Sequence, residues 1–134
     1  MNQLLIFGNK ASAGPLGIDQ SAAFQFGKRF LHCVRVDSGL LREIADDAFR
    51  RSPELAAAAR DDLLAVYERD PATHRLMQPI LFFKGYQALQ AYRIGHWLWQ
   101  QGRFDLAYFV QMRCSEVFGV DIHPAARIGT GVMI

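Results

Sequence analysis

Histidines near carboxylates are the residues of this chain whose spacing could support acid–base chemistry. His123 follows Asp121 by two positions, and a histidine held by a carboxylate is a common general base for activating a hydroxyl group. His123 also precedes Pro124 inside a short repeat, so we expect a structural role for it. His96 lies beside Trp97 on a predicted helix, and we expect it to be a packed or interfacial histidine rather than a base.

The remaining charged candidates have plain structural interpretations when they are considered one at a time. Asp70 precedes Pro71, which is common turn chemistry and favours a helix cap, and Asp121 alone is typical of a solvated loop. Lys84 and Arg93 could recognise an anion, but solvated or ion-paired side chains are the favoured interpretation. These residues therefore establish no site by themselves.

Neither a metal site nor a phosphate loop is predicted. His32, His74, Cys33 and Cys114 lack the spacing of metal ligands. The Gly-Thr-Gly run at 129–131 is not followed by the Gly-Lys-Ser/Thr pattern of a phosphate loop. The two cysteines are isolated, which suits a reducing cytosol better than a disulfide framework, so we expect a cytoplasmic protein.

The composition excludes several classes of function. The chain has 134 residues with 15 basic and 13 acidic side chains, a formal net charge of +2, and no long block of like charges, so a nucleic-acid partner has little support. No apolar run reaches the roughly 18 residues that a membrane helix needs. A chain of this length supports one domain with a modest core.

The C-terminal residues carry a six-residue repeat. Ile122, Ile128 and Ile134 are six residues apart with small residues between them, which is the register of a hexapeptide-repeat parallel β-helix. Such coils bury their interior only against neighbouring coils, so about three or more repeats are needed for stability. The sequence therefore predicts only the first edges of a β-helix over 120–134.

Helical patterns occupy the chain from Asp37 to Gly119. Apolar residues spaced by one to four positions predict a first helix that includes Leu40–Phe49. Ser52, followed by a proline, predicts the start of a second helix that ends at Asp70, which is also placed to cap a short helical turn through His74 and Leu76.

The longest predicted helix runs from about Ile80 to Gln101 and is closed by Gly102 as a left-handed cap. Its interior glycines, Gly85 and Gly95, each lower helix propensity by about 1 kcal/mol, and such glycines usually permit close approach of another backbone. A further helix is predicted from Arg103 to Phe118 and ends at Gly119.

Three segments give this chain a family resemblance. They are DPA at 70–72, FKGYQALQAYRIGHWLWQQGR at 83–103 and VDIHPAARIG at 120–129. On these segments the chain resembles the bacterial serine acetyltransferases from about Asp37 to Ile134. The resemblance implies a mainly α fold, with a multi-helix domain over 37–119 leading into the first edges of a truncated left-handed parallel β-helix over 120–134. Residues 1–36 depart from the family and are expected to form a poorly ordered arm.

The resemblance implies acetyl transfer from acetyl-CoA to the hydroxyl of L-serine, as a step of cysteine biosynthesis. In the family the base is a histidine of an Asp-His pair, and the motif places that pair directly after Ile134. Asp121 matches the carboxylate that orients this histidine, which is absent from the chain. Asp70 matches a carboxylate that helps bind the amino group of serine. Acetyl-CoA would be a co-substrate; no cofactor and no retained cofactor-binding residue are expected.

We therefore expect a catalytically incomplete chain, because the base and the acetyl-CoA groove lie beyond Ile134. The alternative is a non-enzymatic helical oligomerisation module or a fragment. A homo-oligomer through the helical domain is expected, whereas a cysteine-synthase complex is not, because the family's C-terminal tail is missing. Neither a nucleic acid nor a membrane is an expected partner.

Overall fold

A computed structural model of the chain describes residues 39–134, which form a helical domain followed by an extended segment. The arm expected over 1–36, with His32 and Cys33, lies outside the described residues. The helices are α2 (Gly39–Arg51), α3 (Pro53–Arg69), α4 (Met77–Phe82), α5 (Lys84–Gln100) and α6 (Phe104–Phe118). The prediction of a mainly helical fold is confirmed for the described residues.

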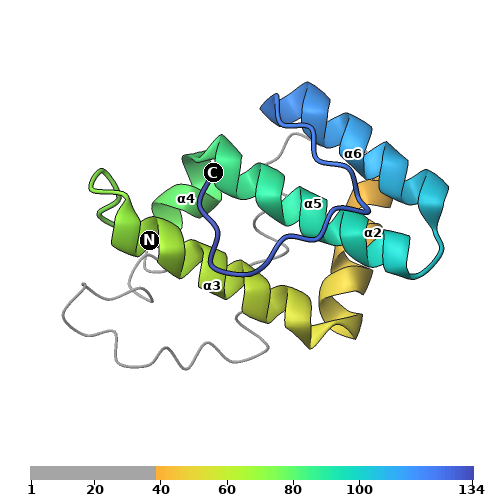
Figure 1. The fold of residues 1–134 in the computed structure, drawn as a ribbon, viewed down its shortest axis with the longest axis horizontal. Helices are drawn as coiled ribbons and strands as arrows, with labels where there is room; N and C mark the ends of the chain where they lie inside the picture. Colours follow the sequence, from red (N-terminus) through yellow and green to blue (C-terminus); the bar gives the residue numbers. More distant parts are fainter. Residues whose placement is uncertain (1–38) are drawn as a thin grey trace.

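Helix α5 lies between α3 and α6 and runs antiparallel to both, as Figure 1 shows. Helix α2 packs across one end of α3 and α5. One apolar cluster joins α2 and α6 to the C-terminal half of α5, and it includes Ala48 and Leu98, which have no exposed surface. A second cluster joins α3, α4 and the start of α5 around Ile80 and Tyr86. Burial of these side chains supplies most of the driving force for folding.

Two helix ends follow the predicted glycine chemistry. Gly102 has φ 73° after α5, and the amides of Arg103 and Gly102 donate to the carbonyl groups of Leu98 and Trp99 at 3.0 Å each, a Schellman arrangement. Gly119 likewise ends α6 in the left-handed conformation. Both predicted stop signals are therefore confirmed. Glycine occupies these positions because a residue with a side chain would be strained at these φ angles.

The single long helix predicted over 80–101 is wrong. Phe83 has an extended backbone (φ −95°, ψ 106°) and separates α4 from α5. The amide of Phe83 donates to the Pro79 carbonyl group, and the amide of Gln87 donates to the Phe83 carbonyl group. The Gln87 side chain donates to the Ile80 carbonyl oxygen at 2.9 Å, so the broken ladder is partly satisfied and the break costs less than sequence propensity suggests.

Two predicted caps differ in detail. Ser52 has the extended backbone of an N-cap before Pro53, but its side chain makes no capping hydrogen bond. The helical turn expected through His74 and Leu76 is a non-helical turn and bend. Its amides at His74 and Arg75 donate to the Gln78 side chain at 2.7 and 2.8 Å, which leaves α4 to begin at Met77.

The extended segment, residues 120–134, crosses α5 and α3 and ends near the start of α5 (Figure 1). No strand occurs among the described residues 39–134. Nor does any helix in this part of the chain have the length and apolar character needed to cross a membrane.

Candidate functional site

Asp70 follows α3 as its C-cap, and its carboxylate is fixed by the turn that comes next. Oδ1 accepts the amide hydrogen of Ala72 at 2.9 Å, and Oδ2 accepts the hydroxyl hydrogen of Thr73 at 3.0 Å. Thr73 is itself buried, with 2% exposure, whereas Asp70 is half-buried. Each carboxylate oxygen can accept a second hydrogen bond. The geometry therefore offers a preset anionic acceptor for a cationic group.

Asp121 lies in the extended segment just after α6 and is exposed. The side-chain amide of Gln111 donates to its Oδ1 at 2.7 Å. Among residues 39–134 no hydrogen bond to Oδ2 is found, so this oxygen is available to an N–H donor. The arrangement suits a carboxylate that orients another group.

The two aspartates are not brought together by this structure. They follow α3 and α6, which lie on opposite sides of α5, and they share no hydrogen bond among the described residues. The residues 39–134 therefore contain two separate carboxylate positions rather than one assembled active site.

Sequence reasoning missed the most buried charged group, Asp62 on α3. Its side chain has 0% exposure and forms a two-pronged ion pair with Arg93 of α5, at 2.7 Å from Nε to Oδ2 and 2.8 Å from Nη2 to Oδ1. The Gln90 side chain also donates to Oδ2 at 3.0 Å, although its own Oε1 has no partner. The ion-paired interpretation of Arg93 is confirmed.

The missed signal was the helical register of Asp62. It lies three residues after Ala59 and four before Val66, so it falls on the buried stripe of α3. Its neighbour Asp61 lies off that stripe and is half-buried. A carboxylate on an apolar stripe needs a cation from an adjacent element, and Arg93 was the available candidate.

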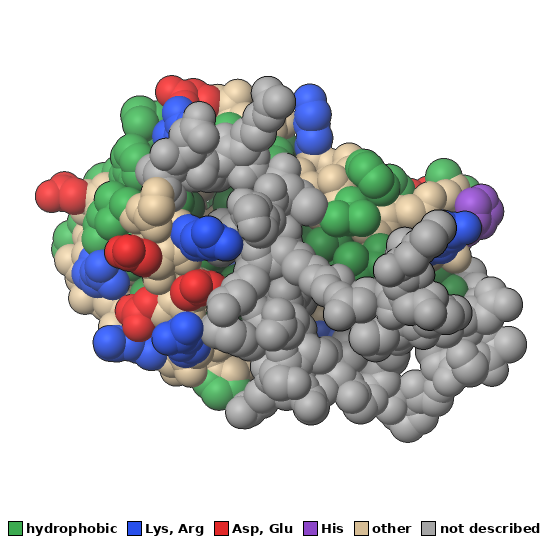
Figure 2. Space-filling view, turned by 180° about the vertical axis from the view of Figure 1, so that it is seen from behind, with side chains coloured by type: hydrophobic (Ala, Val, Ile, Leu, Met, Phe, Trp, Pro, Cys, Tyr) green, Lys and Arg blue, Asp and Glu red, His purple; other side chains and the backbone are tan. Residues whose placement is uncertain are grey.

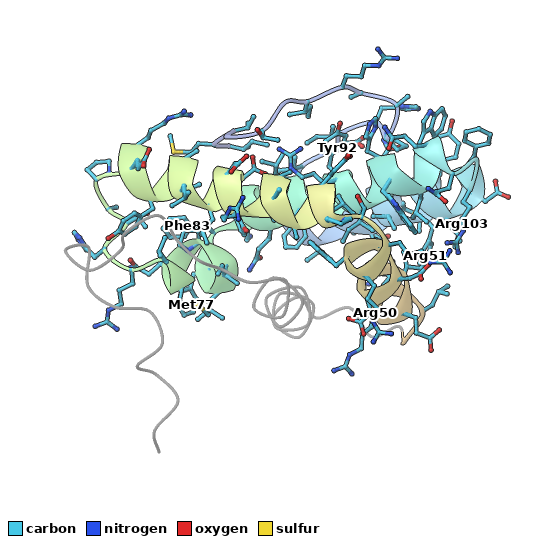
Figure 3. The ribbon with its side chains drawn as sticks, turned by 90° about the horizontal axis from the view of Figure 1, so that it is seen from below. Arg50, Arg51, Met77, Phe83, Tyr92 and Arg103 are labelled. Atoms are coloured by element: carbon cyan, nitrogen blue, oxygen red, sulfur yellow. The ribbon has the colours of Figure 1, made fainter. Side chains whose placement is uncertain are left out.

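The extended segment is anchored to the helices by side chains rather than by strand pairing. Tyr92 donates its hydroxyl hydrogen to the Ala126 carbonyl oxygen and accepts the amide hydrogen of Ile128 at 3.3 Å. Figure 3 shows Tyr92 on the side of α5 that faces this segment. Burial raises the pKa of the Tyr92 hydroxyl, so the group stays protonated and can donate. Arg69 adds a hydrogen bond to the Gly131 carbonyl oxygen at 3.0 Å.

Both histidines that could have been bases make structural contacts. His96 lies 2.7 Å from the Pro124 carbonyl oxygen through Nδ1, which assigns the proton to Nδ1 and leaves Nε2 to accept from Gln100. His123 accepts the amide hydrogen of Ala125 at Nδ1 and packs edge-on against Trp99. These contacts agree with the structural roles expected for both residues.

Cys114 is a buried thiol on α6, in contact with the carbonyl oxygens of Ala88 and Val120 at 3.7 and 3.5 Å. Burial, with a smaller contribution from the charge of Asp121, raises its pKa to about 11. In residues 39–134 no three His, Cys, Asp or Glu residues are grouped so that they could hold a metal ion. The face shown in Figure 2 carries basic and acidic side chains side by side, rather than a patch of one sign.

Known proteins similar to this chain include serine acetyltransferases. The family described as "Serine acetyltransferase, N-terminal" matches residues 17–91, so the match begins before Asp37 and includes Asp70. The serine acetyltransferase of Escherichia coli strain K12 is 53% identical over 94 residues, which are 70% of this chain and 34% of that protein. The chain thus spans about a third of the length of the curated relatives it matches.

Solved structures are similar in fold as well as in sequence. The Neisseria gonorrhoeae serine acetyltransferase in complex with serine has a TM-score of 0.75 and 43% identity, over 83% of this chain and 47% of that one. The Brucella abortus strain S19 enzyme in complex with coenzyme A has a TM-score of 0.71 and 40% identity, over 88% of this chain and 46% of that one.

Proposed function

This chain belongs to the serine acetyltransferase family, and from that premise we propose that the protein transfers the acetyl group of acetyl-CoA to the hydroxyl of L-serine. The reaction breaks the thioester C–S bond and forms an ester C–O bond, while the hydroxyl proton passes through a base to the departing thiolate. The observation that carries the proposal is the likeness to solved family members whose complexes contain serine and coenzyme A.

We assign to Asp70 the binding of the amino group of the substrate serine. Its two oxygens are held by Ala72 and Thr73 and each keeps one lone-pair direction. A carboxylate fixed before the substrate arrives loses little conformational entropy on binding an ammonium group. This is the contribution to substrate binding that the described residues support best.

We assign to Asp121 the role of orienting the catalytic histidine. Gln111 occupies Oδ1, which leaves Oδ2 to accept the Nδ1–H of an imidazole and to stabilise the imidazolium that forms when serine is deprotonated. In the family pattern that histidine belongs to the Asp-His pair placed after Ile134, outside these 134 residues.

Residues 120–134 are proposed to begin a left-handed β-helix, in the cytoplasmic setting that the isolated cysteines favour. Ile122 and Ile128 are half-buried, and Ile134 is 56% exposed. Their six-residue spacing and the extended backbone support stacking against further coils, which would cover the exposed aliphatic groups.

Association of the helical domain with other copies is a second proposal, favoured by an exposed stripe on α6. Phe104, Tyr108 and Met112 follow one another at four-residue spacing and are 48, 46 and 50% exposed. Large apolar side chains grouped on a helix face favour a protein contact. Light scattering of the Met112→Glu variant should give a lower mass than the unsubstituted protein, whereas Gln101→Glu should not change it.

The test of the enzymatic proposal is acetyl-CoA consumption by the complete protein with L-serine. L-alanine is the matched control, because it keeps the amino and carboxylate groups but lacks the hydroxyl. A rate that depends on serine and is absent with alanine supports the proposal. Equal rates with both amino acids, or no rate above background with either, contradict it.

A polypeptide made of residues 1–134 alone should turn over serine at least about 10²-fold more slowly than the complete family enzymes, because it lacks a positioned base. A rate within about tenfold of such an enzyme would contradict this expectation and would require a base among the four histidines of the chain.

A further inference from the structure

Asp62 and Arg93 form a buried ion pair with each other. Each side chain also makes a hydrogen bond to the backbone of the extended segment. The Val132 amide donates to Asp62 Oδ1 at 3.0 Å, and Arg93 Nη2 donates to the Gly129 carbonyl oxygen at 2.7 Å. The pair thus contacts two backbone groups that are three residues apart. A slip of the segment by one residue would break both hydrogen bonds.

Asp62 has no capacity left for a ligand. Oδ1 accepts from Arg93 and Val132, and Oδ2 accepts from Arg93 and Gln90. These four hydrogen bonds use all the lone-pair directions of a carboxylate, and the side chain has no exposed surface. A direct role in binding substrate is therefore excluded for this group.

The pair is also a poor device for stability alone. Removing two charges from water costs several kcal/mol, and apolar residues of similar size often replace a buried ion pair without loss of stability. What apolar side chains cannot replace is the pair of directional bonds to Gly129 and Val132. Specification of register is the physical property that distinguishes this ion pair from a packed apolar contact.

The segment fixed in this way connects two parts of the proposed active site. Asp121 precedes it, and the family position of the Asp-His pair comes directly after Ile134. The bonds from Tyr92 and His96 hold the same segment at Pro124, Ala126 and Ile128. Any shift of residues 124–134 on α3 and α5 would move the groups at its two ends.

We propose that Asp62 and Arg93 are positioning residues of the acetyl-transfer reaction, which set the register of residues 124–134 on the helical domain. The inference rests on the proposed function. Because small misplacement of reacting groups can cost about 10²-fold in rate, the pair acts on kcat. The serine KM depends on Asp70, whose turn shares no hydrogen bond with the pair.

The test is the Asp62→Leu/Arg93→Met double variant in the complete protein. We expect a kcat about tenfold to hundredfold lower, a serine KM within about twofold, and a melting temperature close to that of the unsubstituted protein because the charges are removed together. Amide exchange should quicken over residues 126–132 while α3 and α5 stay protected. The exposed pair Asp47–Arg51, removed as Asp47→Asn/Arg51→Gln, is the control and should change none of these values.

A second variant, Val132→Pro, guards against a double variant that fails to fold. It removes only the N–H that Asp62 accepts and leaves the ion pair in place, so kcat should fall with little change in melting temperature. An unchanged kcat in a folded variant of either kind overturns the inference. So does unchanged exchange over 126–132 in the double variant. A wild-type protein without serine-dependent activity instead overturns the proposed function, and the exchange experiment still tests whether Asp62 and Arg93 hold residues 126–132 in place.

Discussion

Gly85 lies directly beneath the carbonyl group of Ile134. A Cβ built on this glycine would overlap the carbonyl oxygen and would lie 2.8 Å from the carbonyl carbon. The close backbone approach expected at Gly85 is confirmed, although this glycine is the second residue of α5 rather than an interior residue of a longer helix. The extended segment can reach the start of α5 only because residue 85 has no side chain.

The Gly85→Ala variant should therefore be destabilised by about 1–3 kcal/mol, as in other overpacked sites, despite the better helix propensity of alanine. Chemical denaturation measures the free energy of unfolding, and amide exchange should quicken at residues 132–134. A variant more stable than the unsubstituted protein, with unchanged exchange, would contradict the close approach.

Gly95 provides the matched comparison on the same helix. A Cβ there would meet Ala107, Val110 and Pro124 at 3.7–3.9 Å, which are ordinary packing distances. Close approach does not require this glycine, contrary to expectation. Gly95→Ala should be neutral or stabilising by up to about 1 kcal/mol in the same denaturation measurement, and a loss comparable to that of Gly85→Ala would contradict this difference.

The Asp70→Asn variant should separate the charge of this residue from its turn. The Oδ1 of asparagine can still accept the Ala72 amide hydrogen, and its Nδ2–H can donate to the Thr73 hydroxyl oxygen, so the free energy of unfolding should change by less than about 1 kcal/mol. Loss of the charge-assisted bond to the substrate ammonium should raise the serine KM by about tenfold or more.

Steady-state kinetics with varied serine and saturating acetyl-CoA measures this effect. The comparison variant is Thr73→Val, which removes the hydroxyl donor to Asp70 but keeps the charge, and it should raise the serine KM by a smaller factor. A serine KM that is unaffected by Asp70→Asn would remove Asp70 from the binding site.

Gln111→Leu should lower kcat by about three- to tenfold, the effect of losing one hydrogen bond of roughly 1 kcal/mol that restrains Asp121. The Gln111 amide binds Oδ1, and without it the carboxylate can rotate away from the histidine that it is proposed to orient. Pre-steady-state measurement of acetyl transfer reports this step. Gln101→Leu is a control at an exposed glutamine whose side chain makes no hydrogen bond among residues 39–134, and an equal loss of rate there would contradict a specific role for Gln111.

The ends of the helices were predictable because local chemistry decides them. Gly102 and Gly119 adopt positive φ values, and the Asp70-Pro71 step ends α3, each for a reason that involves only a few neighbouring residues. The break at Phe83 was not predictable in this way. It depends on Gln87 reaching the Ile80 carbonyl group and on the packing of Ile80 and Tyr86 against α3, which are contacts between elements.

The same distinction between local chemistry and contacts between elements applies to the candidate site. Asp70 and Asp121 were proposed from their motifs, while the ion pair that anchors the segment between 124 and 132 was not predicted. Asp62 and Arg93 are 31 positions apart, and neither position alone indicates that their side chains meet. Only the packing of α3 against α5 joins them, so the positioning residues had to come from the structure.

Cys114 offers a reporter of the charge at Asp121. Its pKa of about 11 against the ordinary 9.0 means that about one thiol in a thousand is ionised at pH 8 in the folded protein. In a Cys33→Ser background, a thiol-specific disulfide reagent should label Cys114 far more slowly than the unfolded chain. Asp121→Asn removes the charge that contributes to the raised pKa, so labelling should quicken. Unchanged labelling would contradict this electrostatic coupling.

The same pKa has a consequence for stability at alkaline pH. The folded value lies above the unfolded value, so the unfolded state loses its thiol proton first as pH rises. The contribution of Cys114 to stability is therefore fully present below about pH 9 and is lost as pH rises toward 11. Other groups also titrate there, so the informative quantity is the difference in unfolding free energy between Cys33→Ser and Cys33→Ser/Cys114→Ala, measured from pH 7.5 to 10.5. That difference should shrink with rising pH, and a constant difference would mean that the thiol has the same pKa in both states.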